Sequence, residues 1–305
     1  PALDELIKTI EKKADSVKGI IKTGRTHLMD AMPIDFSEEL RAWSGQLNSS
    51  KEMLNILEKK FLELPQGGTA VGSGINAHKQ FSKYFAQEIT KLTGNKCKYI
   101  PSKNFYHELS AQDCSVQLSG ELKNLAVILT KISNDLRWMN SGPLAGLSEI
   151  ELKALQPGSS IMPGKVNPVI PEAVAMASAD VIGNDVSITV AAQSGNFQLN
   201  VMLPVIAYNL LKSINLLSGS MEALSKKAIK TFKVNKKNLD VSLSRNPILV
   251  TALNPIIGYE KAAEIAKKAY KENRSIVEVA SKETNIPKGK LKKLLDPSKL
   301  AKGGI

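Results

Sequence analysis

Apolar side chains recur every three or four positions along most of the chain, which is the spacing of one buried face of an α-helix. The first such stretch runs from Leu3 to Ile21 and ends at Gly24. The second runs from Leu40 to Leu64 and ends before Pro65. It is much longer than a mean helix of about 11–12 residues. The pattern therefore predicts helices that are unusually long for a small domain.

The same spacing predicts further helices over 79–94, 108–140, 169–191 and 199–230. No segment has the regular alternation that would indicate a run of strands. Aromatic residues make up only 5% of the chain, and such a composition suits helix packing by aliphatic side chains. We therefore expect an all-α fold built as a bundle of long helices.

A change of pattern near residue 235 predicts a domain boundary. Residues 1–234 are expected to form a central helical bundle, and residues 235–305 a small C-terminal helical domain. In the second segment the helices are shorter and rich in Lys, and Pro247, Pro255 and Pro287 interrupt them. No internal repeat is visible. The expected organisation is one large and one small helical domain.

Charge and composition limit the partners of the chain. Its 41 basic and 29 acidic residues give a net charge of +12, which permits an acidic partner. The lysines are spread along the chain without a nucleic-acid-binding motif, so a solvated surface and no nucleic acid are expected. Only Cys97 and Cys114 are present, which fits a reducing compartment. No run approaches the ~20 apolar residues of a membrane span. A cytoplasmic protein without a membrane partner is the prediction.

The segment "GSSIMPGKVNP", residues 158–168, combines flexible backbone with functional side chains. Ser159 and Ser160 follow a glycine that can adopt unusual backbone angles. Lys165 and Asn167 stand just before the next predicted helix, where one can bind a carboxylate by charge and the other by amide donation. The alternative is a capped turn in which Ser and Asn satisfy backbone groups. Both interpretations are compatible with the residues alone.

The segment "GRTHLMDAMP", residues 24–33, places Arg25, Thr26, His27 and Asp30 between two predicted helices. A single His is either structural or, beside a carboxylate, an acid or base at neutral pH. Glu172 is a candidate partner for it. No zinc, iron–sulfur or EF-hand spacing is present, and no G-x-S-x-G motif indicates a serine hydrolase. His78 and His107 have no second ligand at metal spacing.

Taken together, these segments carry a family resemblance. "GSSIMPGKVNP" resembles the signature loop of the fumarase/aspartase superfamily. Five further segments resemble blocks of class II fumarases and follow the same order along the chain: "GRTHLMDAMP", "LPQGGTAVGSGIN", "NDLRWMNSGP", "GNFQLNV" and "TALNPIIGYEKAAEIAKKA". The match covers essentially the whole chain, and the set of blocks is highly specific. The pair Thr26-His27 resembles fumarases, since aspartases typically carry Thr-Gln there.

The resemblance implies a fold, a reaction and an assembly. The central domain would be a long-helix bundle, and four subunits would pack into a homotetramer with shared active sites. The reaction would be the reversible hydration of fumarate to L-malate, through an aci-carboxylate intermediate and without cofactor or metal. The partner would be a small dicarboxylate.

The resemblance also assigns roles to individual residues. Ser159 would be the base that removes the C3 proton, and Ser160 would contact the substrate beside it. Lys165 and Asn167 would bind a substrate carboxylate. Thr26 and His27 would contact the substrate and the active-site water. Glu172 would pair with His27 and tune its proton affinity.

One departure and several alternatives accompany this interpretation. Members of the family are longer at the N-terminus, so the chain is expected to lack the family's N-terminal domain. Whether this chain is active without that domain stays open. Another fumarate-releasing lyase of the superfamily is the nearest alternative: aspartate ammonia-lyase, argininosuccinate lyase or adenylosuccinate lyase. A further alternative is a non-catalytic helical scaffold or a basic nucleic-acid-binding remnant, whose binding would weaken steeply with salt.

Overall fold

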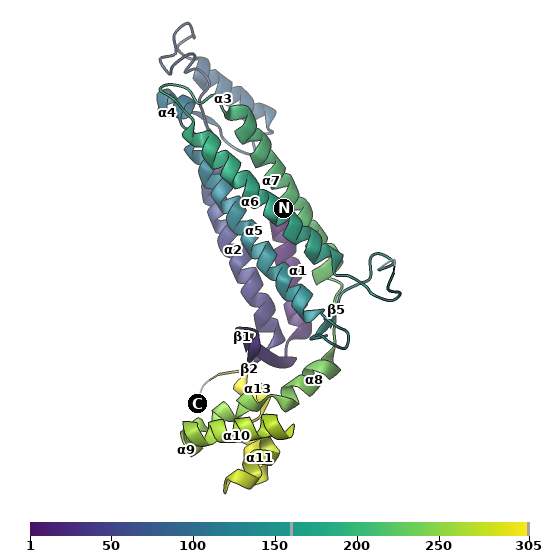
Figure 1. Cartoon of the computed structure of the whole chain (residues 1–305). Coiled ribbons are helices and arrows are strands. Elements are labelled where there is room, and N and C mark those ends of the chain that lie inside the picture. Colours follow the sequence, from purple (N-terminus) through teal and green to yellow (C-terminus); the bar gives the residue numbers. More distant parts are fainter. Residues whose placement is uncertain (159–160, 304–305) are drawn as a thin grey trace. The chain divides into compact units, whose positions relative to one another are not determined.

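The computed structural model describes residues 1–158 and 161–303, and long helices dominate it (Figure 1). This confirms the predicted all-α bundle. The long helices are α1 (Ala2–Val17), α2 (Phe36–Lys60), α5 (Asp113–Met139), α6 (Val169–Gln193) and α7 (Leu203–Ala223). A π-helical turn, η1 (Leu224–Ile229), continues α7.

Shorter elements complete the described residues. The short helices are α3 (Phe81–Leu92), α4 (Phe105–Ser110), α8 (Lys236–Arg245), η2 (Pro247–Leu253), α9 (Asn254–Ile257), α10 (Tyr259–Glu272), α11 (Ile276–Glu283), α12 (Lys288–Leu294) and α13 (Pro297–Leu300). The strands are β1 (Ile21–Thr26), β2 (Met29–Asp35), β3 (Glu63–Leu64), β4 (Ile100–Pro101), β5 (Ile150–Glu151) and β6 (Lys233–Val234). They pair as β1–β2, β3–β4 and β5–β6.

The first predicted helix is too long, and this is a correction to the sequence pattern. The helix α1 ends at Val17, and Gly19 then takes a positive φ of 83°. Residues Ile21–Thr26 instead pair antiparallel with Met29–Asp35 in a hairpin. The apolar Ile20 and Ile21 fit a helical period as well as a strand, so local spacing could not separate the two. The segment that carries His27 is therefore a β-hairpin.

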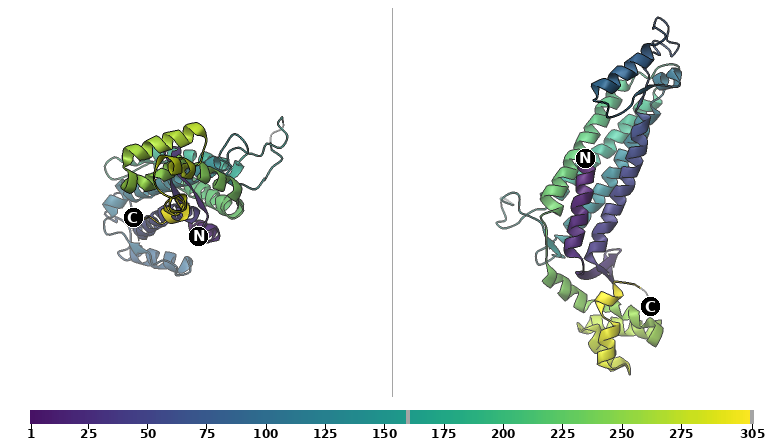
Figure 2. Two further views of the ribbon diagram at one scale, coloured as in Figure 1. Left: turned by 90° about the horizontal axis from the view of Figure 1, so that it is seen from below. Right: turned by 180° about the vertical axis from the view of Figure 1, so that it is seen from behind.

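The chain divides into two compact units, the first formed by residues 1–6, 45–134 and 169–224. Its interior is apolar and lies between helices, with buried positions such as Leu125, Leu129 and Ile188. The helices α6 and α7 pack side by side along their length (Figures 1 and 2). On α6, the buried Asp185 accepts a hydrogen bond from Ser119 Oγ of α5 at 2.6 Å.

The second unit is formed by residues 7–44, 135–168 and 225–305 and contains the β1–β2 hairpin. At the start of α2, the buried Phe36 ring stacks on Phe232 with the ring centres 6.2 Å apart. Asn246 ties the C-terminal segment to the hairpin, because its buried amide donates to the Ala31 carbonyl at 2.8 Å. Residues from Leu249 to Leu295 form an apolar core cluster of their own.

One described helix, α6, is long and apolar enough by composition to cross a membrane. The same property belongs to core helices of soluble proteins, so it is weak evidence. The helix carries Asp180, which pairs with Lys212 of α7 at 2.9 Å, and the buried Asp185. Charges paired with a neighbouring helix indicate a packed bundle helix.

Candidate functional site

The signature loop is closed at its base by a contact that requires glycine. Gly158 has a φ of +87°, and a Cβ built there would collide with the carbonyl oxygen of Lys165. The Lys165 amide donates to the Met162 carbonyl at 3.1 Å, which forms a turn just before it. The two ends of the loop therefore touch in the backbone. Ser159 and Ser160, the expected base and its neighbour, lie outside the described residues.

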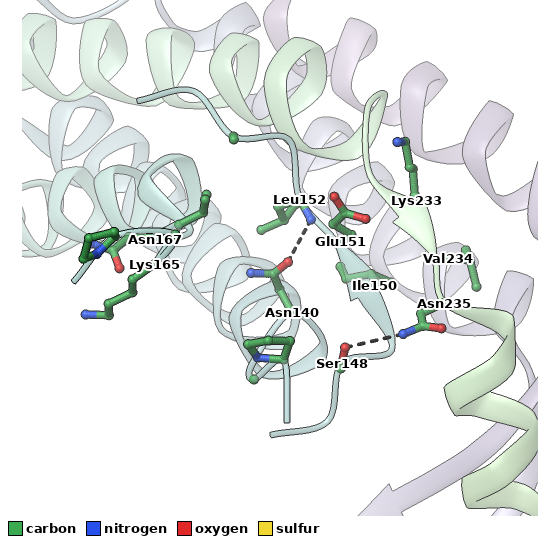
Figure 3. A pocket seen from close by; sticks show the side chains of 16 residues that line it. Asn140, Ser148, Ile150, Glu151, Leu152, Lys165, Asn167, Lys233, Val234 and Asn235 are labelled. Atoms are coloured by element: carbon green, nitrogen blue, oxygen red, sulfur yellow. Dashed lines mark hydrogen bonds between the residues drawn. The ribbon is translucent and has the colours of Figure 1, made fainter. Parts of the chain in front are cut away.

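Lys165 and Asn167 line one pocket of about 880 Å³ in the second unit (Figure 3). This places together two of the residues expected to bind substrate. The other side chains that Figure 3 labels in this pocket are Asn140, Ser148, Ile150, Glu151, Leu152, Lys233, Val234 and Asn235. The Lys165 side chain is exposed and Asn167 is partly buried. The residues that line the pocket thus carry two ammonium groups, several amides and one carboxylate.

Two polar groups in this pocket are not evident from the sequence pattern. Asn140 follows the last residue of α5, and its side-chain oxygen accepts a hydrogen bond from the Leu152 amide at 2.8 Å. That bond turns the amide nitrogen toward the side of the pocket that holds Lys165 (Figure 3). Lys233 lies opposite Glu151 in the β5–β6 pair. Their placement depends on pairing between distant segments, which local periodicity does not report.

Thr26 and His27, the other two residues expected to contact the substrate, are exposed on the β1–β2 hairpin. Thr26 ends β1, and His27 and Leu28 form a two-residue turn with φ values of 55° and 61°. Two positive φ values are the signature of a type I′ hairpin turn, which usually selects Asn-Gly. Side chains larger than glycine cost about 1–3 kcal/mol each there. His27 is exposed at the tip, so its imidazole is free to face a ligand or another surface.

Not all of the expected residues line this one pocket. Thr26 and His27 do not line the pocket that holds Lys165 and Asn167. Glu172, the expected partner of His27, lies in the first turn of α6 and in the first unit. The His27–Glu172 pair therefore stays a prediction.

The remaining histidines have local partners. The His78 ring nitrogen Nδ1 accepts a hydrogen bond from the Gln80 amide at 3.2 Å. His107 Nε2 contacts Asp113 at 2.9 Å, and this hydrogen bond raises the pKa of His107. Within the described residues, no group of three or more His, Cys, Asp or Glu side chains has the arrangement of a metal site. These contacts give both residues a structural explanation.

The pocket chemistry suits a small carboxylate. An ammonium group attracts a carboxylate by charge, and amide donors satisfy its oxygens in fixed directions. Lys165, Lys233 and the Asn140 amide are donors of these kinds, while Glu151 supplies one acceptor. Negative charge that develops on a bound carboxylate would be stabilised by such preorganised donors.

Comparison with known proteins identifies the family of the chain. The family described as "Lyase" matches residues 1–183, and the family described as "Fumarase C C-terminus" matches residues 249–302. The fumarate hydratase class II 2 of Pseudomonas aeruginosa is 58% identical over 305 residues, which are 100% of this chain and 66% of that protein. The fumarate hydratase class II of Bacillus subtilis is 45% identical and covers 99% of this chain and 65% of that protein.

A solved structure has the same fold. The crystal structure of class II fumarase from Schistosoma mansoni matches with a TM-score of 0.95 and 33% identity, over 99% of this chain and 66% of that chain. The chain belongs to this lyase family. The relatives named here are class II fumarate hydratases, the group that the resemblance predicted. It spans 65–66% of the length of the relatives named above.

Proposed function

We propose that the chain carries the central and C-terminal parts of an enzyme that reversibly hydrates fumarate to L-malate. The observation that supports this most strongly is the pocket in which Lys165 and Asn167 meet, in a member of the class II fumarate hydratase group. Lys165, Asn167 and the neighbouring Asn140 amide are suited to hold one carboxylate of a small dicarboxylate.

The proposed mechanism uses residues of the loop and of the hairpin. Ser159 removes the C3 proton of malate, which leaves an aci-carboxylate. Lys165 and Asn167 bind the negative charge that builds on that carboxylate more tightly than they bind the ground state, and this difference lowers the barrier. His27, with Glu172 as its partner and Thr26 beside it, gives a proton to the C2 hydroxyl, which leaves as water.

We further propose a homotetramer whose active sites combine different copies. Thr26 and His27 are exposed and do not line the pocket of Lys165 and Asn167, which is the arrangement that a site shared between copies would show. Exposed apolar side chains on α5, α6 and α7 are the kind of surface that a further copy covers. They include Val127, Met176, Ile182, Val186, Val190, Val205, Tyr208, Leu211 and Ile214.

Domain organisation and location are also proposals. The apolar cluster between Leu249 and Leu295 supports a small C-terminal domain over residues 235–305 beside a central domain over 1–234. The charges that α6 pairs with neighbouring helices support a soluble protein that binds no membrane, and the two free cysteines suit the reducing cytoplasm. The net charge of +12 has no accompanying motif for nucleic acid.

The test is the release of fumarate, followed by its ultraviolet absorbance, from L-malate, L-aspartate and argininosuccinate in parallel. Turnover of L-malate alone supports the proposal, and turnover of either other substrate selects an alternative lyase. In Lys165→Met the turnover should fall strongly. Lys153→Met is the matched control, because Lys153 is exposed in the same segment but does not line the pocket. Light scattering on the same sample measures the mass of the assembly.

A further inference from the structure

A cluster of four charged side chains lies at the base of the β1–β2 hairpin. Lys22 Nζ is 2.7 Å from Glu39 Oε2 and 2.7 Å from Glu149 Oε2. Arg25 Nη1 donates to Glu149 Oε1, also at 2.7 Å. The side chains of Lys22 and Glu149 are only 2% and 3% exposed. Both carboxylate oxygens of Glu149 are therefore held by cations of the hairpin.

Stability alone is a weak reason for such a cluster. Removing charges from water costs much of the free energy that their attraction returns, and apolar side chains of similar volume often stabilise a fold as well or better. What a buried ion cluster supplies is fixed geometry, since each charge holds its partners at short distance. The ring of Phe36, 4.8 Å from Lys22 Nζ, further confines that ammonium group.

The cluster acts on the part of the hairpin that carries the exposed turn. Arg25 immediately precedes Thr26, and its backbone pairs with Asp30 in the second strand. Beyond this pair, His27 and Leu28 hold positive φ angles that cost energy. A strained turn keeps its conformation only when its surroundings hold it. Within the described residues, the Arg25–Glu149 bond is the ion pair nearest in sequence to that turn.

The backbone of Glu149 is bonded next to the wall of the pocket that Lys165 and Asn167 line, because both of its neighbours in the chain, Ser148 and Ile150, line that pocket. Its amide donates to the Met139 carbonyl at 2.8 Å, and its carbonyl accepts from the Asn235 amide at 2.9 Å. Asn235 and the next residue along the chain, Ile150, both line the pocket. The backbone of Glu149 is thus fixed to the pocket wall, while its side chain holds the hairpin.

We infer that Glu149 is a positioning residue that holds the His27 hairpin in a fixed place relative to the pocket wall of the same copy. The inference rests on the proposed function for its catalytic meaning, because it assumes that His27 reacts. Glu149 touches no substrate in this account and acts through Arg25. Loss of its charge leaves its backbone bonds and therefore the pocket wall in place.

The experiment compares Glu149→Gln, Arg25→Gln and Glu39→Gln with the parent chain. The chain has three His, so ¹⁵N-histidine labelling gives an imidazole signal for His27 that can be assigned with His27→Gln. We expect the His27 signal to shift or broaden in Glu149→Gln and Arg25→Gln, and the other two His signals to stay. Misplacement of a reacting group by about 1 Å costs about 10²-fold, so kcat for L-malate should fall by that order, with little change in KM.

Glu39→Gln is the matched control, because Glu39 contacts Lys22 and leaves the Arg25–Glu149 bond intact. It should lower the melting temperature without moving the His27 signal. If Glu149→Gln fails to fold, Arg25→Gln still tests the link, since the half-buried Arg25 leaves the pairs of Lys22 in place. An unchanged His27 signal in Arg25→Gln overturns the inference, as does an equal shift in Glu39→Gln. A parent chain without hydratase activity rejects the proposed function, while the His27 signal still decides whether Glu149 positions the hairpin.

Discussion

Replacement of Gly158 by Ala isolates the contact that closes the signature loop. Gly158 and Gly164 have nearly equal positive φ angles of 87° and 84°. A Cβ at Gly158 collides with the Lys165 carbonyl oxygen, whereas a Cβ at Gly164 meets nothing within 4 Å. Both substitutions therefore introduce the same backbone strain, but only Gly158→Ala also introduces a collision.

The magnitude follows from these two contributions. A side chain in the left-handed region costs about 1–2 kcal/mol, and this applies to both variants. In Gly158→Ala the Lys165 carbonyl must also move by roughly 1 Å to reach ordinary van der Waals separation. Such a displacement of a binding group costs about 10²-fold in rate. We expect a loss of this order in kcat/KM for L-malate, and a much smaller loss in Gly164→Ala.

The assay measures fumarate absorbance and the melting temperature of both variants. Similar melting temperatures with unequal kcat/KM values would confirm that the collision displaces Lys165. Equal losses of kcat/KM would refute the reasoning, because strain alone would then explain both variants.

Two further predictions concern the first unit. Asp185→Ala leaves the buried Ser119 hydroxyl without its acceptor, which should lower the free energy of unfolding in urea by about 1–3 kcal/mol. The matched variant Asp180→Ala breaks only the surface pair with Lys212 and should cost clearly less; equal losses would contradict the assignment. Asp113 raises the pKa of His107, so this pair stabilises the fold below the ordinary His pKa of 6.5 and ceases to do so as pH rises through the raised value. The difference in melting temperature between the parent and His107→Gln should therefore shrink from pH 5 to pH 9, and a constant difference would argue against it.

Much of the fold could be read from the sequence because helix periodicity is local. The spacing of apolar residues predicted long helices at α2, α5, α6 and α7 to within a few residues at most ends. It failed from Gly19 to Gly24, where the helix has ended and the first strand of a hairpin begins. Asn246 and a buried ion cluster fix the position of that hairpin, and those partners come from distant segments.

In the candidate site, too, some residues could be predicted from the sequence and others could not. Motif resemblance identified Lys165 and Asn167, which line one pocket, and Thr26 and His27, which the hairpin exposes. It could not identify the Asn140 amide, because the direction of that amide depends on a hydrogen bond to Leu152.

The sequence by itself determined the family, the helical class and the residue types that can bind a carboxylate, because each depends on neighbours along the chain. Only the tertiary structure decided that Glu149 would hold Lys22 and Arg25 and that Gly158 would touch Lys165. Such contacts form where separate elements meet in space, and their strength depends on burial and distance. Neither quantity is encoded in the local order of residues.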